Sequence, residues 1–269
     1  MMKKKLIALM LGAATVSSSV MAWEPNGLGG KVDFGGVVTI NSISTKNPWE
    51  VFVGGKTSGL DANVATGATT VKIPLSTSIP VLGIRTVSNT AFEGAVGITP
   101  QINYGGKVDL SSFNNGTATL TIDANDSSNS KIGTMTAPIY AGAIVSRRNP
   151  SENIDTDHFY GIALPKNAGD AFFGGLSTSN SGVPTHAGEL ESTLKKIDPA
   201  FSANWDDQGW GITDERWTGP FSVSGRTYSA YYGSGIQSGE AIVLNLDAPF
   251  NSSTVIQWNA QLPIVVSYQ

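Results

Sequence analysis

The sequence predicts an all-β protein, and three observations support that class. Short runs in which apolar and polar residues alternate recur along the chain, which is the pattern of half-buried strands. Charged residues make up 14% of the chain and 31 of its 269 residues are glycine, a balance typical of many short strands joined by turns. The last segment, VIQWNAQLPIVVSYQ at 255–269, alternates most clearly of all.

The first 22 residues have the three parts of a secretory signal peptide. MMKKK is basic, LIALMLGAA is apolar but too short to cross a bilayer, and Val20, Met21 and Ala22 form a cleavage site. We therefore expect Trp23 to begin the mature chain. Loss of the three leader lysines leaves a net charge of about −7, which argues against nucleic acid as a partner. No later segment has the apolar length of a membrane-spanning helix, so we expect no membrane insertion.

The first half of the mature chain contains most of the expected strands. They lie at 32–40, 49–53, 69–75, 81–87 and 98–104. Two further runs, 107–113 and 117–123, flank Asn114, Asn115 and Gly116, residue types that tolerate the positive φ of a tight hairpin turn.

The end of the chain predicts a long, half-buried final strand. Its apolar residues share one parity: Ile256, Trp258, Ala260, Leu262, Ile264, Val266 and Tyr268. The run 241–247 alternates as well, and we expect it to pair with the final strand through the turn at 248–253.

Residues 146–229 differ from the rest, because loop-like stretches there surround one helical pattern. Leu190, Leu194 and Ile197 are spaced as on one helix face, and Glu191 and Lys195 form a favourable pair one turn apart. This pattern predicts a short amphipathic helix that stops near Pro199, within an inserted subdomain.

The segment GGKVDFGGVVTI at 29–40 follows the leader closely. Four apolar residues, Val32, Phe34, Val38 and Ile40, share one parity, with Gly36 between them. A strand with such a face at a domain edge is a pairing hazard, which natural folds usually cover or charge.

This segment resembles the N-terminal extension of chaperone/usher fimbrial subunits. Further motifs follow along the chain: PVLGIRT at 80–86, GITPQI at 97–102, FFGGL at 172–176, NWDD at 204–207, YGSGIQSGE at 232–240 and QWNAQLPIVVSYQ at the end. With these motifs the whole chain resembles the K88 (F4), F41 and CS31A group of fimbrial major subunits, and NWDD and YGSG favour the F41 branch. The lack of cysteine also matches this group.

The resemblance implies an incomplete immunoglobulin-like sandwich that is completed by donor-strand exchange. It divides the chain into a signal peptide (1–22), a donor-strand extension (23–42), a pilin core (43–145 and 230–269) and an insert (146–229) that is the candidate receptor-binding region. The donor strand would insert Val32, Phe34, Gly36, Val38 and Ile40 into a neighbouring subunit. The alternative is an ordinary first strand that folds back within its own domain.

The resemblance also implies the partners and the location. The subunit would be exported through the periplasm, held there by a chaperone that contacts Ile264, Val266 and Tyr268, and passed through an outer-membrane usher. It would then join identical or related subunits in a surface fimbrium that binds host glycans or glycoproteins. One position departs from the pattern, because many such subunits have glycine where this chain has Ile256.

The segment NWDDQGWGITDERW is the strongest candidate for a glycan site. It places Trp205, Trp210 and Trp217 among polar residues that include Asp206 and Asp207. Sugars present apolar faces to aromatic rings and hydroxyls to carboxylates, so this mixture suits a shallow carbohydrate site. The alternative is that the tryptophans pack the insert onto the sandwich while the charges face water.

The sequence favours no catalytic residue, metal or cofactor. Adjacent residues on a strand point in opposite directions, so Asp206 and Asp207 do not suit a glycosidase pair. The two histidines, His158 and His186, lie far apart in sequence without metal-ligand spacing. A fimbrial major subunit and adhesin is therefore the leading hypothesis. A minor or purely structural subunit is the second, and a secreted β-sandwich carbohydrate-active enzyme is a remote third.

Overall fold

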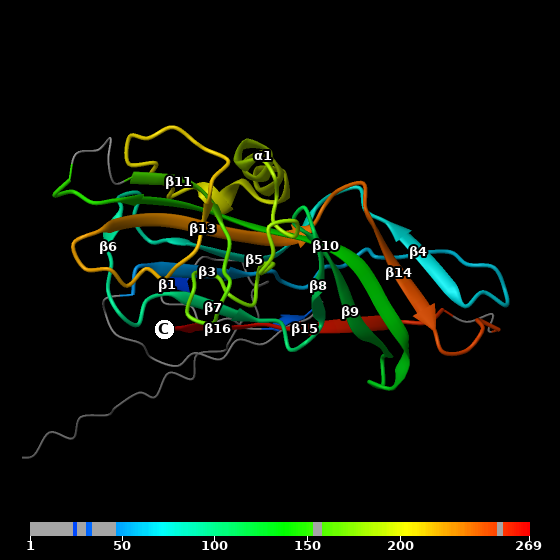
Figure 1. Ribbon diagram of the computed structural model, residues 1–269. Coiled ribbons are helices and arrows are strands. Elements are labelled where there is room, and N and C mark those ends of the chain that lie inside the picture. The colour runs from blue at the N-terminus through cyan, green and yellow to red at the C-terminus, as the bar shows by residue number, and fades with distance from the viewer. Residues whose placement is uncertain (1–23, 26–30, 34–46, 153–157, 252–254) are drawn as a thin grey trace, which may run out of the picture.

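The computed structural model describes residues 24–25, 31–33, 47–152, 158–251 and 255–269. These residues form an all-β, immunoglobulin-like fold with one short α-helix, as the sequence predicts (Figure 1). The expected strands near 49–53, 69–75, 81–87 and 98–104 are confirmed. The signal peptide, and all of the expected donor strand after Asp33, lie outside the described residues.

One part of the sheet lies beneath the helix. Its strands are β1 (Glu24–Pro25), β3 (Trp49–Val53), β5 (Ile79–Thr86), β13 (Thr227–Ile236) and the second half of β10 (Lys131–Arg148), with β6 (Phe92–Glu93), β11 (His158–Ala163) and β12 (Arg216–Trp217) attached. Neighbours along this path pair antiparallel.

The other part of the sheet continues from the first half of β10. Its strands are β4 (Thr70–Pro74), β14 (Ala241–Leu246), β9 (Thr117–Asp126), β8 (Val108–Asn114), β15 (Trp258–Pro263) and β2 (Lys31–Asp33). A separate pair joins β7 (Pro100–Asn103) to β16 (Val265–Tyr268). Because β10 pairs with β14 near its start and with β13 near its end, this one strand joins the two parts.

The main core lies between the two parts of the sheet. Trp49 is fully buried at its centre, where its ring contacts Phe92, Phe172 and Phe221. The Trp49 indole N–H donates to the carbonyl of Ile98 at 2.5 Å, so the polar end of this large ring is satisfied within the core.

A second, smaller core lies under α1 (Ala187–Ile197) and the following 3-10 turn η1 (Pro199–Ser202). The predicted helix is confirmed, since Leu190, Leu194 and Ile197 are buried on one face. The predicted Glu191–Lys195 ion pair is also present, at 3.1 Å. The expected limits of the insert, at 146 and 229, fall within β10 and β13, which continue across them. The division of the chain into a core and an insert stays a prediction.

The predicted hairpin turn is confirmed between β8 and β9. Asn114 pairs with Thr117, and the two residues between them, Asn115 and Gly116, have φ values of 46° and 85°. Both positive values are those of the two-residue turn whose twist matches a hairpin.

The predicted partner of the segment 241–247 is wrong. That segment forms β14, which pairs with β10 and β4 rather than with the final strand. Neighbouring segments often pair, but here β10 and β4 flank β14 on both sides.

The final segment is two strands rather than one. β15 pairs with β9 and β2, whereas β16 pairs with β7, and Ile264 lies at the change between sheets. The predicted alternation persists across the break. Its buried members are Ala260, Leu262, Ile264 and Val266.

Candidate functional site

The first candidate site is the edge of β15, part of which pairs with β2 near the start of the chain. Lys31 lies opposite Pro263, Val32 opposite Leu262, and Asp33 opposite Gln261, in antiparallel register. β2 therefore pairs with the same chain's β15, which is the in-domain alternative that the sequence left open. Of the expected donor-strand residues, Val32 lies in this pairing, while Phe34, Gly36, Val38 and Ile40 lie outside the described residues.

A second pairing lies closer to the mature N-terminus. Glu24 lies opposite Val51 and Pro25 opposite Glu50, so β1 covers the edge of β3. The strands β3 and β15 stand next to the two ends of the main sheet path. Described parts of the N-terminal segment thus pair with both of these strands.

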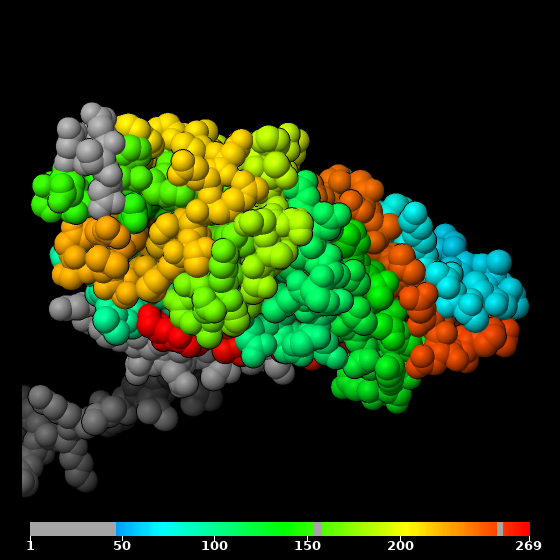
Figure 2. Space-filling model, in the orientation of Figure 1, coloured from blue at the N-terminus to red at the C-terminus, as the bar shows by residue number. Residues whose placement is uncertain are grey.

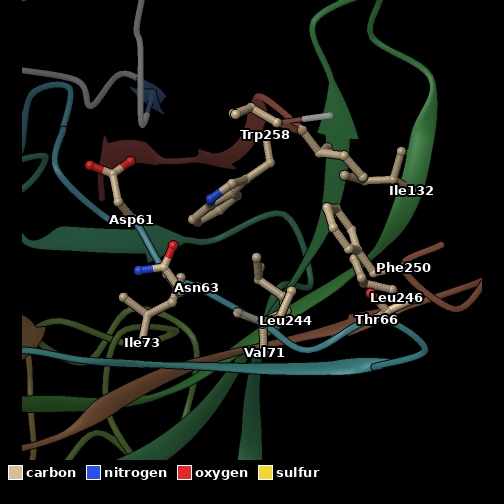
Figure 3. Close-up of a pocket in the computed structure, with 14 residues that line it drawn as sticks. Asp61, Asn63, Thr66, Val71, Ile73, Ile132, Leu244, Leu246, Phe250 and Trp258 are labelled. Carbon is tan, nitrogen blue, oxygen red and sulfur yellow. The ribbon is translucent and has the colours of Figure 1, made fainter. Parts of the chain in front are cut away.

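An apolar pocket of about 380 Å³ opens beside the start of β15 (Figure 3). Its walls come from β4, β14, β10 and β15 and include Val71, Ile73, Leu244, Leu246, Ile132 and Trp258. Asp61, Asn63 and Thr66 contribute polar groups from the loop before β4. Val255 and Ile256 also line the pocket and are 85% and 40% exposed, so apolar surface is left in contact with water here.

Sequence reasoning did not find this pocket, although one signal was visible. Ile256, the residue that departs from the family pattern, lies in its wall. A large aliphatic side chain near the start of a half-buried strand, directly after a turn, indicates an apolar surface with no local partner.

The three residues expected to contact the chaperone lie at the end of the chain, Ile264 just before β16 and Val266 and Tyr268 within it. Ile264 and Val266 are buried in the main core, and Tyr268 packs against it. Burial raises the pKa of the Tyr268 hydroxyl above its usual value of 10.0, and a hydrogen bond with Asn47 opposes this shift.

The second candidate site, the tryptophan-rich segment, lies in a different part of the molecule. Figure 2 shows the yellow surface of this region at the upper left and the cyan surface of β4 at the far right. The pocket and the tryptophan-rich segment are therefore separate surfaces.

Polar contacts around Glu50 attach this segment and the turn before it to the sandwich. Asn204 donates to the Glu50 carboxylate at 3.0 Å and to the Thr86 carbonyl at 2.8 Å. Arg85 forms a 2.5 Å ion pair with the same carboxylate and donates to the Ala200 carbonyl. Because the Arg85 and Glu50 side chains are only 14% and 11% exposed, this group holds the insert on the sheet.

Asp206 is likewise engaged with the backbone. Its carboxylate accepts hydrogen bonds from the Ala91 and Gln208 amides, each at 2.9 Å. Its own carbonyl accepts from the Ser146 hydroxyl at 2.7 Å. Asp207, in contrast, is exposed and accepts one hydrogen bond from the Gly209 amide.

The three tryptophans do not gather in one place. Trp217 stacks on Phe221 at 5.2 Å in the main core. Trp205 packs against Tyr160 and Tyr231 in the second core, and Trp210 lies against His158 with ring centroids 3.4 Å apart. Trp205 and Trp210 are both partly exposed.

The surface beside Trp205 carries negative charge. Burial, followed by the negative charge of Glu191, raises the pKa of the Tyr160 hydroxyl to about 12, and Asp207 adds to the effect. Tyr160 therefore stays protonated at neutral pH. A hydrogen bond joins it to the side chain of Trp205.

The described residues contain no group of three or more histidine, aspartate or glutamate side chains placed to hold a metal ion. None of the helices in the described part of the chain is both long and apolar enough to cross a membrane.

These observations define an immunoglobulin-like protein whose candidate sites are a sheet edge with an adjoining apolar pocket and a separate aromatic surface. Comparison with protein families matches residues 2–269 to the K88-type family described as "Fimbrial, major and minor subunit". The chain belongs to this family and is a fimbrial subunit, which associates with other subunits in an extracellular fimbrium. No curated protein matches the chain significantly.

Proposed function

We propose that this chain is a fimbrial major subunit of the F41 branch, that it polymerises by donor-strand complementation, and that it performs no catalysis. The observation that carries the proposal is the register of β2 on β15. The same N-terminal strand, donated by a neighbouring subunit, would occupy the same edge.

The register supports a specific fit for a donated strand. Continued one residue at a time, it places Phe34 opposite Ala260, Gly36 opposite Trp258, and Val38 opposite Ile256. Residues directly opposite on antiparallel strands share a face, so the apolar side of the donor would face the core. The large Phe34 would then lie opposite the small Ala260, and Gly36 would lie opposite Trp258, the largest side chain of β15.

The pocket supports the same arrangement. Ile256 lines it, so Val38, which would lie opposite Ile256, would bring an apolar side chain to its mouth. At about 1.5–3 kcal/mol for each fully buried apolar side chain, Val32, Phe34, Val38 and Ile40 together would contribute about 6–12 kcal/mol before ordering costs.

Two neighbouring glycines provide the test. Gly36→Leu places a side chain against Trp258 and should abolish fibre formation, measured by electron microscopy and by SDS-resistant oligomers. Gly35→Leu changes the adjacent residue, which would face solvent, and should leave assembly largely intact. Normal fibres from the Gly36→Leu chain would refute donation in this register.

We also propose that a periplasmic chaperone and an outer-membrane usher handle the subunit before assembly. The chaperone would contact the final segment of the chain at Ile264, Val266 and Tyr268, which are every second residue. Binding to the chaperone should survive Gly36→Leu, because that substitution lies outside the final strand. Co-purification of the variant with its chaperone measures this.

The partly exposed face formed by Trp205, Trp210 and Asp207 is the proposed receptor surface for a host glycan or glycoprotein. Its two indole rings and one exposed carboxylate supply the apolar and polar contacts that a sugar needs. Asp206 is left out of this surface because its carboxylate accepts two backbone amides, and Trp217 because it stacks on Phe221 against the main core, whereas Trp205 and Trp210 pack against the second core.

Haemagglutination and glycan-array binding by purified fibres test the receptor surface. Trp210→Ala should reduce binding at least tenfold without affecting assembly. Val223→Ala, at an exposed apolar residue elsewhere on the surface, is the matched control and should bind normally. Fibres that bind no glycan at all would favour a minor or purely structural subunit.

A further inference from the structure

We propose that the secreted subunit also has a closed monomeric form, in which its own N-terminal segment covers its own sheet edges and blocks assembly. The inference rests on the proposed function, because it concerns the regulation of the same strand and the same edge. In this form β2, the start of the expected donor strand, occupies part of the acceptor edge of its own chain. Exchange then requires the segment to leave its own chain first.

The two in-chain pairings carry this inference. β1 pairs with two residues of β3, and β2 pairs with three residues of β15, so these two short strands occupy parts of the strands next to both ends of the main sheet path. Pairing with both β3 and β15 holds the two strands in place better than either pairing alone. Uncovered edges attract other strands, and this arrangement covers them without a partner.

The covalent connection favours pairing within the chain at low protein concentration. β2 is joined to β3 through residues 34–48, a short connection. Because β2 and its site belong to one chain, β2 meets that site at an effective concentration that can reach the millimolar range. A neighbour's strand at micromolar concentration competes poorly, so the closed form predominates until subunits are concentrated or delivered to one another.

Engineered disulfides distinguish pairing within a chain from pairing between chains. The chain contains no cysteine, so the double variant Asp33→Cys/Gln261→Cys introduces the only two thiols. These positions lie directly opposite each other in the register, which suits a cross-strand disulfide. Asp33→Cys/Ser267→Cys is the matched control, because Ser267 is exposed on β16, which pairs with β7.

The mature double variant, purified as a monomer at micromolar concentration, is oxidised with diamide. We expect one monomeric band that migrates faster without reductant, and a yield that does not change on tenfold dilution. The control pair should stay reduced. A monomer whose thiols remain free and react with maleimide would overturn the closed form.

The same double-cysteine variant, assembled into fibres, tests separately whether neighbouring subunits exchange the N-terminal strand. In assembled fibres the disulfide should link neighbouring subunits and give a ladder of covalent oligomers. Fibres without a ladder would overturn donation in this register while leaving the monomer result intact. Mixed single variants, Asp33→Cys with Gln261→Cys, allow only links between chains and should give dimers in fibres but not in the dilute monomer.

A second measurement applies if the cysteine pair prevents folding. Deletion of residues 24–33 removes both in-chain strands while leaving the rest of the chain unchanged. The closed form predicts that this deletion lowers the melting temperature of the dilute monomer and that the loss is independent of protein concentration. An unchanged melting temperature would contradict it.

Discussion

At the scale of single residues, the polar side chains of the insert act mainly as anchors. Glu50 accepts from both Arg85 and Asn204, so one partly buried carboxylate ties the turn after α1 to the sheet. Loss of one partner of such a buried pair costs about 3–5 kcal/mol, because the remaining charge is left without compensation. NWDD is therefore in part a folding motif, whatever its exposed residues bind.

A second anchor joins the start of α1 to the loop before β12. His186 Nδ1 lies 2.9 Å from a carboxylate oxygen of Asp214, and the other oxygen accepts from the Ala187 amide at 2.8 Å. The hydrogen bond with Asp214, followed by its charge, raises the pKa of His186 above 6.5. The hydrogen bond with His186, followed by that from the Ala187 amide, lowers the pKa of Asp214 below 3.8.

This pair predicts a pH-dependent contribution to stability. The raised histidine pKa stabilises the fold below about pH 6.5, and this contribution is lost as the pH rises through the folded-state pKa. The lowered aspartate pKa stabilises it above about pH 4, and this contribution is lost on acidification. The pair should therefore contribute most between about pH 4 and 6.5.

Urea denaturation of the wild type and His186→Gln across pH 4 to 8 measures this contribution. The difference in unfolding free energy should be largest near pH 5 and should shrink above pH 7. A difference that grows with pH would contradict the assignment.

At the scale of elements, α1 lies close to the sheet because glycines face it. A Cβ added at Gly142 on β10 would lie 2.0 Å from a methyl carbon of Leu190. At Gly233 on β13 it would lie 2.4 Å from the Phe201 ring. The contact at Gly233 gives a physical reason for glycine at the second position of the motif YGSG, because a side chain there would overlap Phe201.

Two alanine substitutions at glycines should therefore have opposite effects. Gly233→Ala should lower the free energy of unfolding by about 1–3 kcal/mol, because the added methyl overpacks the interface with η1. Gly188→Ala, in the exposed first turn of α1 where an added Cβ meets nothing, should raise it by about 0.5 kcal/mol. Thermal and urea unfolding measure both, and equal effects would contradict this account of the interface.

At the scale of the whole molecule, the proposed assembly edge and the proposed receptor surface occupy separate regions. The pocket and the edge of β15 lie along β4, β14 and β15, whereas the tryptophan-rich segment lies beyond α1 (Figures 1 and 2). If both proposals hold, this separation would let neighbouring subunits hold a subunit while its aromatic surface remains accessible.

Moving the N-terminal strand to the other end of the chain should give a stable monomer. Lys31 pairs with Pro263, close to the C-terminus, so a strand appended after Gln269 through a flexible linker can turn back along β15. A chain without residues 23–41 but with GGKVDFGGVVTI appended should remain monomeric and resist unfolding. Size-exclusion chromatography and thermal unfolding provide the measurement.

The matched control carries leucine in place of the second glycine of the FGG motif within the appended strand. That chain should have a lower melting temperature, because the leucine cannot fit opposite Trp258. Equal melting temperatures would show that the strand does not occupy this edge, and the proposed mode of assembly would fail.

Local patterns were enough to predict several elements. The turn at Asn115 and Gly116, the helix at Leu190 to Ile197 and the alternation along 260–266 depend on propensity and periodicity, which neighbouring residues determine. The all-β class follows from the same short-range information. Family membership is also carried by the sequence, because it is read from motifs along the whole chain.

Only the tertiary structure decided which strands pair and which side chains meet. β14 pairs with β10 and β4, although its sequence neighbour is the final strand, and the tryptophans of one segment divide between two cores. The pocket likewise combines residues from β4, β10, β14 and β15. Such contacts depend on the summed packing of distant segments, so no local pattern of residues encodes them.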